Sequence, residues 1–328
     1  MDNIIPNLIT NYKPKKFGKE YVNINGSSQY PMFISTALGI KPSFDDWVDV
    51  KHYKKFVKMC KNYNLFVDPD VIFQKPKSNK NALIGGNTLT TTYAIGKKYN
   101  PKIKNGKVHV FISKSKKTLL EAKKFGWYPV ATKSRCINKP FIDHLRFGKK
   151  LGFPSCCINF FKKYNNWNIY SHPFETFKKT PKNNQKITGS YLCNNFLMDN
   201  TFFLIHHLPC SYRCKKTMNY AKSVEENIKK VEPDFIKKTK QLLKKPLLVF
   251  SERNFIIFDG KLSNNSLKYT NYQYLTNPGR PEETIGFFNS IKNGNKIEFK
   301  YNKLLIKKND KITSLITKKN TWFMINFE

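Results

Sequence analysis

The chain has 328 residues, of which 40% are hydrophobic and 15% aromatic, and its formal net charge at pH 7 is +37. This length and apolar content exclude an intrinsically disordered chain and predict one large or two ordinary folded domains. No apolar run approaches the roughly 20 residues that cross a bilayer. The most apolar segment, Thr201 to Ile205, is followed directly by His206 and His207. The first residues of the chain do not resemble a signal peptide. We therefore expect no membrane association and a soluble, cytoplasmic protein with reduced thiols.

The positive charge has two competing explanations. Lysine side chains that neutralise phosphates release counterions, so RNA, tRNA in particular, or another polyanion is an expected partner. The chain is also rich in Asn, Ile, Phe and Tyr, which is the bias of an AT-rich genome, and its basic residues are spread over the whole length. Compositional drift therefore competes with a functional basic surface, and both explanations predict salt-sensitive binding to polyanions.

Residues 1 to 135 predict an α/β region. Asp46 to Tyr63 carries apolar residues at helical spacing, which predicts an amphipathic helix. Three further elements follow, with Lys107 to Ser113 as a buried strand, Lys116 to Phe125 as a helix and Trp127 to Ala131 as a returning strand. The short turns between them predict a βαβ unit with a parallel crossover.

Residues 136 to 245 predict a mainly helical region that bears Cys and His residues. Phe141 to Leu151 has an apolar helical face, and Gly152 is placed to end that helix with a left-handed cap. Pro154 suits the start of a second helix, because its missing N–H costs nothing there. Pro209 is predicted in the same way to open a long basic helix that is broken near Pro233.

From Pro246 onward, short β-branched and aromatic runs separated by turn residues predict strands. Asn309 and Asp310 are predicted to form the tip of a hairpin. Residues 246 to 328 therefore predict a small antiparallel β domain, which contains neither Cys nor His. The expected fold class is α+β, with a mixed α/β N-terminal and central part, helices that carry the cysteines, and this β domain.

Four of the seven cysteines lie behind prolines at predicted helix starts: Cys156, Cys157, Cys210 and Cys214. Unpaired backbone N–H groups and the helix dipole favour thiolates there, which suits metal ligands or reactive thiols. Cys210 and Cys214 are four residues apart, so one face of a helix presents both to one ion or cluster. Cys156 and Cys157 diverge by about 100° on a regular helix. Both bind one centre only if the turn is irregular; otherwise one packs or reacts.

Other side chains near these cysteines in sequence extend the candidate site. His207 and Cys193 are further candidate metal ligands, since histidine and thiolate suit zinc or iron, and all-thiolate sets suit zinc or an iron–sulfur cluster. Asp143 and His144 are the candidate acid/base pair, with Cys157 as a candidate catalytic thiol. The competing explanations are an exposed helix segment for Asp143 and His144, and buried small hydrophobic residues for the cysteines.

Three segments carry a resemblance to a known family: Gly152-Phe153-Pro154-x-Cys156-Cys157-x-x-Phe160-Phe161, His207-x-Pro209-Cys210-Ser211-x-x-Cys214 and Pro246-Leu247-Leu248-Val249-Phe250. They resemble the signatures of a family of archaeal and bacterial proteins that has no established activity, over roughly residues 140 to 260. The resemblance implies that the cysteines and the histidine act together. The cysteine pairs are also similar to those of iron–sulfur proteins in thiol-redox or tRNA-modifying enzymes, although Gly is missing after Cys157.

Two functions follow from these residues. The first is a metal-dependent enzyme whose iron–sulfur cluster, or single Fe or Zn ion, serves redox chemistry, sulfur transfer or RNA-base modification. Its class would be an iron–sulfur or thiol-dependent oxidoreductase or transferase. The second is a non-catalytic, zinc-stabilised, basic nucleic-acid-binding protein, in which zinc joins the two helix starts.

Overall fold

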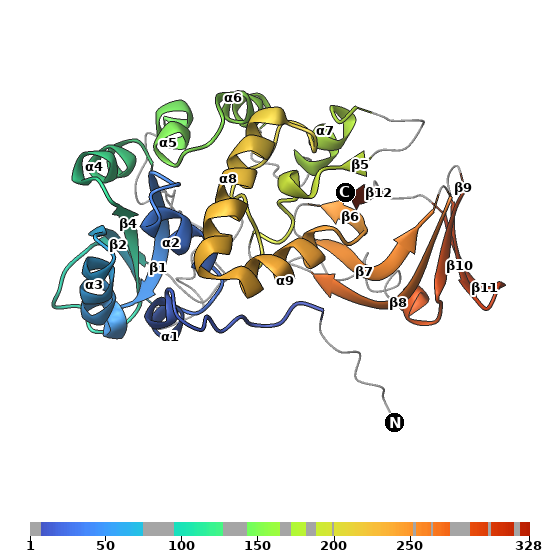
Figure 1. The fold of residues 1–328 in the computed structure, drawn as a ribbon, viewed down its shortest axis with the longest axis horizontal. Helices are drawn as coiled ribbons and strands as arrows, with labels where there is room; N and C mark the ends of the chain where they lie inside the picture. The colour runs from blue at the N-terminus through green and yellow to red at the C-terminus, as the bar shows by residue number, and fades with distance from the viewer. Residues whose placement is uncertain are drawn as a thin grey trace.

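A computed structural model describes residues 8–74, 95–126, 143–164, 172–181, 188–198, 200–251, 254–263, 265–275, 289–300, 303–317 and 322–328. These residues form the expected α+β fold, with helices and a small sheet toward the N-terminus and a larger, strand-rich part toward the C-terminus (Figure 1). Helix α8 (Lys215–Val231) crosses the middle of the molecule between the two sheets. No described helix is both long enough and apolar enough to span a membrane.

The N-terminal sheet has the strand order β1-β4-β2-β3, and its strands are β1 (Ser43–Asp49), β2 (Phe66–Gln74), β3 (Ile95–Lys98) and β4 (Lys107–Ser113). The helices around it are α1 (Lys19–Asn25), α2 (Tyr30–Ala37), α3 (Tyr53–Asn62) and α4 (Lys116–Phe125). Strand β4 and helix α4 confirm two elements of the predicted βαβ unit. All pairings of β4 with its described neighbours are antiparallel, and the predicted returning strand, residues 127–131, lies outside the described residues.

The helix predicted from Asp46 is wrong in its first part. Residues 43–49 form β1, a short 3₁₀ turn follows, and α3 begins only at Tyr53. Phe44, Asp46 and Val48 alternate into the interior, and the buried Asp46 carboxylate accepts hydrogen bonds from Tyr21 and Asn25. A period of two and a period of 3.6 overlap in so short a stretch, so hydrophobic spacing did not separate strand from helix.

The central helices follow the N-terminal sheet in sequence and are α5 (His144–Lys150), α6 (Ser155–Tyr164), α7 (His172–Lys178), α8 and α9 (Pro233–Leu243). The break at Pro233 confirms the prediction, since proline fits the first turn of α9 and has no N–H to continue α8. Pro209 does not start a helix, however. The chain from Thr201 to Ser211 has no regular structure, and α8 begins at Lys215 with Cys214 as its N-cap residue.

The C-terminal part has a strand at each predicted position, although β7 continues through Asp259 and Gly260, and it contains two further strands, β5 and β8. The sheet has the order β11-β10-β9-β8-β7-β6-β12-β5. Its strands are β5 (Thr188–Gly189), β6 (Leu247–Ser251), β7 (Asn254–Leu262), β8 (Ser266–Leu275), β9 (Lys296–Lys300), β10 (Lys303–Lys308), β11 (Lys311–Thr317) and β12 (Phe323–Phe327). Only β5 and β12 run parallel among the described pairings. Asn309 and Asp310 have positive φ values of 49° and 66°, as a tight hairpin turn between β10 and β11 requires.

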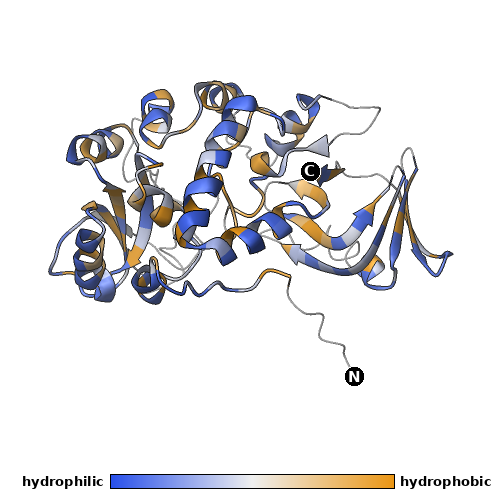
Figure 2. Cartoon of the chain, in the orientation of Figure 1, coloured by the Kyte–Doolittle hydropathy of each residue, from blue (hydrophilic) through white to orange (hydrophobic). Residues whose placement is uncertain are grey.

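One apolar core joins most of the molecule. It contains Phe33 of α2, Phe235 of α9, Leu247 of β6 and Ile325 of β12, all fully buried. Helix α8 contributes a buried stripe at helical spacing, with Ala221, Val224 and Ile228, while its outward face is hydrophilic (Figure 2). The division of the chain near residues 135 and 245 remains a prediction, and this core crosses both positions.

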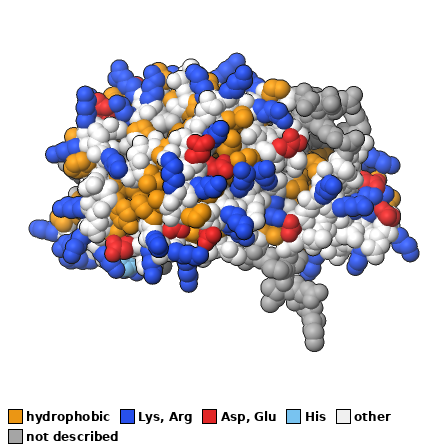
Figure 3. Space-filling view, viewed as in Figure 1, with side chains coloured by type: hydrophobic (Ala, Val, Ile, Leu, Met, Phe, Trp, Pro, Cys, Tyr) orange, Lys and Arg blue, Asp and Glu red, His pale blue; other side chains and the backbone are white. Residues whose placement is uncertain are grey.

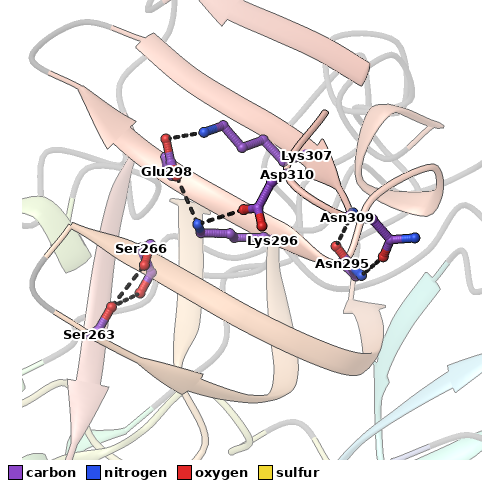
Figure 4. Close-up of polar contacts among 8 residues, drawn as sticks. All are labelled: Ser263, Ser266, Asn295, Lys296, Glu298, Lys307, Asn309 and Asp310. Carbon is purple, nitrogen blue, oxygen red and sulfur yellow. Dashed lines mark hydrogen bonds and ion pairs between the residues drawn. The ribbon is translucent and has the colours of Figure 1, made fainter. Parts of the chain in front are cut away.

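The outer strands of the large sheet carry a polar network on their surface (Figure 4). Glu298 on β9 accepts from Lys296 at 2.9 Å and from Lys307 on β10 at 2.7 Å, and Lys296 also pairs with Asp310 at 3.1 Å. Lys307 and then Lys296 lower the pKa of Glu298 to about 2. Part of the positive charge on these strands is therefore balanced within the sheet.

Candidate metal centre

The connection between α5 and α6 places the first pair of cysteines. Gly152 has φ = 79°, and the backbone N–H groups of Gly152 and Phe153 donate to the carbonyls of Lys149 and Gly148 at 3.1 and 2.8 Å. This is the double hydrogen bond of a Schellman motif, which only glycine completes without strain. The prediction that Gly152 ends the preceding helix is confirmed, and α6 starts three residues later.

Two side chains from the N-terminal part hold this connection in place. The Lys41 ammonium donates to the Leu151 carbonyl, and the Ser43 hydroxyl donates to the Lys150 carbonyl at 2.7 Å. Both acceptors are C-terminal carbonyls of α5 that have no partner within the helix. Lys41 also lies 4.7 Å from the centre of the Phe153 ring. The loop that leads into α6 is thereby fixed to the N-terminal sheet.

Four cysteine sulfurs converge where α6 begins and α8 begins. Cys156 and Cys157 lie in the first turn of α6, Cys214 caps α8, and Cys210 lies in the irregular segment before it. Their Sγ atoms all lie within 4.8 Å of one another. Cys157 and Cys214 are buried, whereas Cys156 and Cys210 are half-buried, so one side of the group approaches the surface. These four residues are called the four-cysteine group below.

The sulfur spacing within the group fits one tetrahedral ion. Cys156 Sγ lies 3.9 Å from Cys157 Sγ and 3.6 Å from Cys214 Sγ, and Cys157 and Cys214 are 3.8 Å apart. Metal–sulfur bonds of about 2.3 Å in a tetrahedron separate the sulfur atoms by about 3.8 Å. Adjacent cysteines were expected to diverge on a regular helix. At the start of α6, however, the Sγ atoms of Cys156 and Cys157 both lie close to Cys214 Sγ, so both can contribute to one metal site. The four-cysteine group can therefore hold a metal ion.

Hydrogen bonds among Cys157, Cys210 and Cys214 shift the pKa values of these thiols in a way that suits a bound cation. Hydrogen bonds from Cys157 and Cys210 lower the pKa of Cys214 well below its usual range, with a further contribution from Thr217. The bonds to Cys210 and Cys214, together with burial, raise the pKa of Cys157. The Cys214 thiolate is thus stabilised by its protonated neighbours, and ionisation of Cys157 and Cys210 as well requires a compensating positive charge such as a metal ion.

Cys193 and His207 lie beside the group but outside it. Cys193 Sγ faces the Cys214 carbonyl at 3.8 Å, and burial raises the pKa of this thiol. His207 Nε2 lies 3.0 Å from the Thr217 hydroxyl, and that hydroxyl lies 3.3 Å from Cys157 Sγ. The structure therefore separates these two residues from the four sulfurs that converge, and brings His207 near them only through Thr217.

Asp143 and His144 have local roles in the structure. Asp143 is the N-cap of α5, and its carboxylate accepts from the backbone N–H groups of Leu145 and Arg146 at 3.1 and 3.0 Å. His144 packs edge-on against the Phe161 ring, and burial followed by the charge of Lys162 lowers its pKa. Neither residue belongs to the four-cysteine group. Their candidate catalytic role remains a prediction that these contacts do not support.

Thr217 and Lys41 were not identified from the sequence as site residues. Thr217 lies three residues after Cys214, the spacing at which the first helical turn returns to its N-cap, and this spacing is a usable signal. Lys41 gives no such signal, because it is one of many lysines and only the fold shows that it is 2% exposed. Burial lowers the pKa of Lys41 to about 7, with Asp45 opposing that change.

Comparisons with known proteins add no name to this arrangement. No protein-family profile, no curated protein and no solved structure matches the chain. The resemblance of the two cysteine segments to an archaeal and bacterial family therefore remains an expectation. The chemistry that can be assigned is the chemistry of the four-cysteine group and its surroundings.

Proposed function

We propose that the four-cysteine group binds a single tetrahedral metal ion, that this ion is zinc, and that the protein is a metal-stabilised nucleic-acid-binding protein. The observation that carries the proposal is the mutual distance of the four sulfurs, at most 4.8 Å. In a four-iron cluster each thiolate binds a different iron and points outward, which needs a wider sulfur spacing than one ion does. A set of four thiolates around one ion suits zinc.

The closed ligand set favours a structural role for the metal. Catalytic zinc sites keep one position for water or substrate, whereas structural sites fill all four positions with protein ligands. An ion bound here would join the start of α6 to the start of α8, two segments that are far apart in sequence. The free energy of metal binding then adds to the stability of the folded chain.

The metal proposal predicts one zinc per chain in protein purified without oxygen, measured by elemental analysis together with acid-labile sulfide. Replacement of any one of Cys156, Cys157, Cys210 and Cys214 by Ala should abolish stoichiometric zinc, because the ion would have only three thiolates. A strong chelator should lower the unfolding temperature of the wild-type protein and leave that of the variants almost unchanged.

Cys193→Ala and Cys60→Ala are the matched controls, since both cysteines are 0% exposed and lie outside the four-cysteine group. Both should keep one zinc per chain. Brown protein with iron and acid-labile sulfide would instead support the iron–sulfur enzyme. Protein without any metal would exclude both metal functions.

The nucleic-acid part of the proposal is supported by the charge on the helices that carry the four-cysteine group and on their neighbours. Exposed basic side chains lie on α6 and α8, at whose starts the cysteines lie, and on or just after α5 and α7, which contact α6. They are called the basic rim: Arg146, Lys149, Lys162, Lys163, Lys178, Lys179, Lys215 and Lys216. Within the described residues, Arg146 and Lys178 have ion-pair partners, and no ion pair joins the other six. Lys and Arg also greatly outnumber acidic side chains on the face shown in Figure 3. Such a surface attracts a phosphate backbone.

The described aromatic residues suggest how binding would occur. Phe66 is the only exposed aromatic side chain among them, and it lies on β2 rather than in the large sheet. Stacking of bases on aromatic side chains of the large sheet therefore receives little support. Contacts to phosphates are then the expected mode of binding, and such contacts do not directly distinguish one nucleotide sequence from another.

This proposal predicts binding to a fluorescent single-stranded RNA of mixed sequence, measured by anisotropy over a range of salt concentrations. The combined change of Lys162, Lys163, Lys215 and Lys216 to Gln should weaken binding. It should also reduce the slope of log K against log salt by about 0.7 for each phosphate that the variant no longer neutralises.

A control with the same reduction of charge tests whether position matters. Lys54, Lys55, Lys229 and Lys230 are exposed on α3 and on the far end of α8, and their combined change to Gln removes the same four charges. This control should retain most of the affinity. Equally weakened binding in both variants would show that net charge, and not the basic rim, is responsible for binding.

A further inference from the structure

A buried hydrogen-bond chain connects the four-cysteine group to a histidine that does not belong to it. The Thr217 hydroxyl lies 3.3 Å from Cys157 Sγ and 3.0 Å from His207 Nε2. Cys157, Thr217 and His207 are 2%, 0% and 5% exposed, so bulk water does not compete for these contacts. His207 Nδ1 is also buried and has no hydrogen-bond partner among the described residues.

When a metal is bound, the number of available protons determines which group donates and which accepts in each of these hydrogen bonds. A cysteine that ligates a metal is a thiolate and only accepts hydrogen bonds. The single hydroxyl proton of Thr217 must then point to Cys157, and the hydroxyl oxygen accepts from His207. The proton of the imidazole therefore lies on Nε2, which leaves Nδ1 without one.

The surroundings of His207 keep the imidazole neutral, so that it carries one N–H and not two. Burial, and next the charge of Lys41, lower the pKa of His207 to about 3. The ring is held between aromatic neighbours, with the Phe153 ring 5.2 Å and the Tyr220 ring 6.1 Å away. The ring position is therefore set by packing, and its tautomer by the contact with Thr217.

We propose that Thr217 and His207 are positioning residues of the metal centre, in which the Nε2–H tautomer of His207 orients the Thr217 hydroxyl toward the Cys157 sulfur. This rests on the proposed metal site. Outer hydrogen bonds of this kind fix a ligand's orientation and stabilise its charged form, and their removal typically lowers metal affinity by about 10- to 100-fold.

The tautomer can be read directly in the wild-type protein loaded with zinc. Long-range proton–nitrogen NMR of protein with ¹⁵N-labelled histidine distinguishes Nε2–H from Nδ1–H, and the His207→Gln spectrum assigns the signal. We expect a neutral ring protonated at Nε2. A ring protonated at Nδ1, or at both nitrogens, would overturn the proposed chain.

Zinc competition with a chromophoric chelator provides the second test. Thr217→Val removes the hydroxyl at nearly constant volume, and we expect zinc affinity to fall by about 10- to 100-fold. Thr217→Ser keeps a hydroxyl and should restore most of the affinity. Thr239→Val is the control, because Thr239 is a helical threonine with 0% exposure whose hydroxyl has no partner among the described residues, and its affinity should stay unchanged.

The outcomes separate the two proposals. If the wild-type protein contains no stoichiometric metal, both the proposed metal site and the proposed hydrogen-bond chain are refuted. If the wild-type protein binds one zinc and the Thr217→Val variant binds zinc as tightly as the wild type does, only the proposed role of Thr217 and His207 is refuted. If Thr217→Val does not fold, the tautomer in the wild-type protein still decides.

Discussion

His172 is a buried histidine with little polar compensation. It is 1% exposed at the start of α7, its ring lies 4.9 and 5.9 Å from those of Phe160 and Phe161, and neither ring nitrogen has a hydrogen-bond partner among the described residues. Burial lowers its pKa to about 4 from an ordinary value of 6.5. Between these values the unfolded chain binds more protons than the folded chain, so protonation of His172 costs the folded state stability as the pH falls below about 6.5.

We predict that His172→Phe raises the free energy of unfolding by about 1–3 kcal/mol, because it removes unsatisfied polar atoms from an aromatic environment. The gain should be larger near pH 5 than near pH 7, since only the wild-type side chain must stay uncharged there. Urea denaturation at the two pH values measures both effects. A variant less stable than wild type at each pH would show that the histidine has a partner which these contacts do not reveal.

At the scale of elements, the junction of α8 and α9 is tied to the N-terminal segment by Glu232. This residue is 3% exposed, and its carboxylate accepts from the Tyr12 hydroxyl at 2.7 Å and from the backbone N–H groups of Lys16 and Phe17 at 3.2 and 3.1 Å. The neighbouring Asp234 pairs with Lys15 at 2.6 Å, but both of these side chains are more than half exposed.

We predict that Glu232→Ala lowers the free energy of unfolding by about 2–4 kcal/mol, because three partly buried hydrogen bonds to a buried, charged acceptor are lost. Asp234→Ala is the matched control and should cost at most about 1 kcal/mol, since exposed ion pairs contribute little. Chemical denaturation gives both values, and limited proteolysis should show earlier cleavage near residue 16 in the first variant only. Equal costs would mean that Glu232 is not the main attachment of the N-terminal segment.

The helix ends that could be predicted are those marked by a residue with a strong backbone preference. Gly152 and Pro233 mark helix boundaries through their own backbone preferences, so the ends of α5 and α8 followed from the sequence. The start of α8 did not, because Pro209 fits a first helical turn equally well in sequence, yet the chain stays irregular as far as Cys214. Only packing of that segment in the core decides between the two.

At the scale of the whole molecule, the candidate ligands were identifiable by residue type and spacing, but their convergence was not. Cys156 and Cys214 meet at 3.6 Å because two helix starts pack together, and no local pattern contains that contact. The same holds for Lys41, which lies just before β1 and donates a hydrogen bond to the loop before α6. Cys193 lies near the group with its sulfur facing a backbone carbonyl, so its role as a metal ligand stays a prediction.

Strand β12 lies between β6 and β5, although β5 precedes β6 in the chain. During synthesis, β6, β7 and β8 can pair as successive hairpins as soon as they leave the ribosome. The edge segment at Thr188 must wait until Phe323–Phe327 has emerged, since its described pairing is with that strand alone. A nascent chain that stalls before this point would leave the edge of β6 that pairs with β12 unpaired, which makes it a target for chaperones and for quality-control proteases.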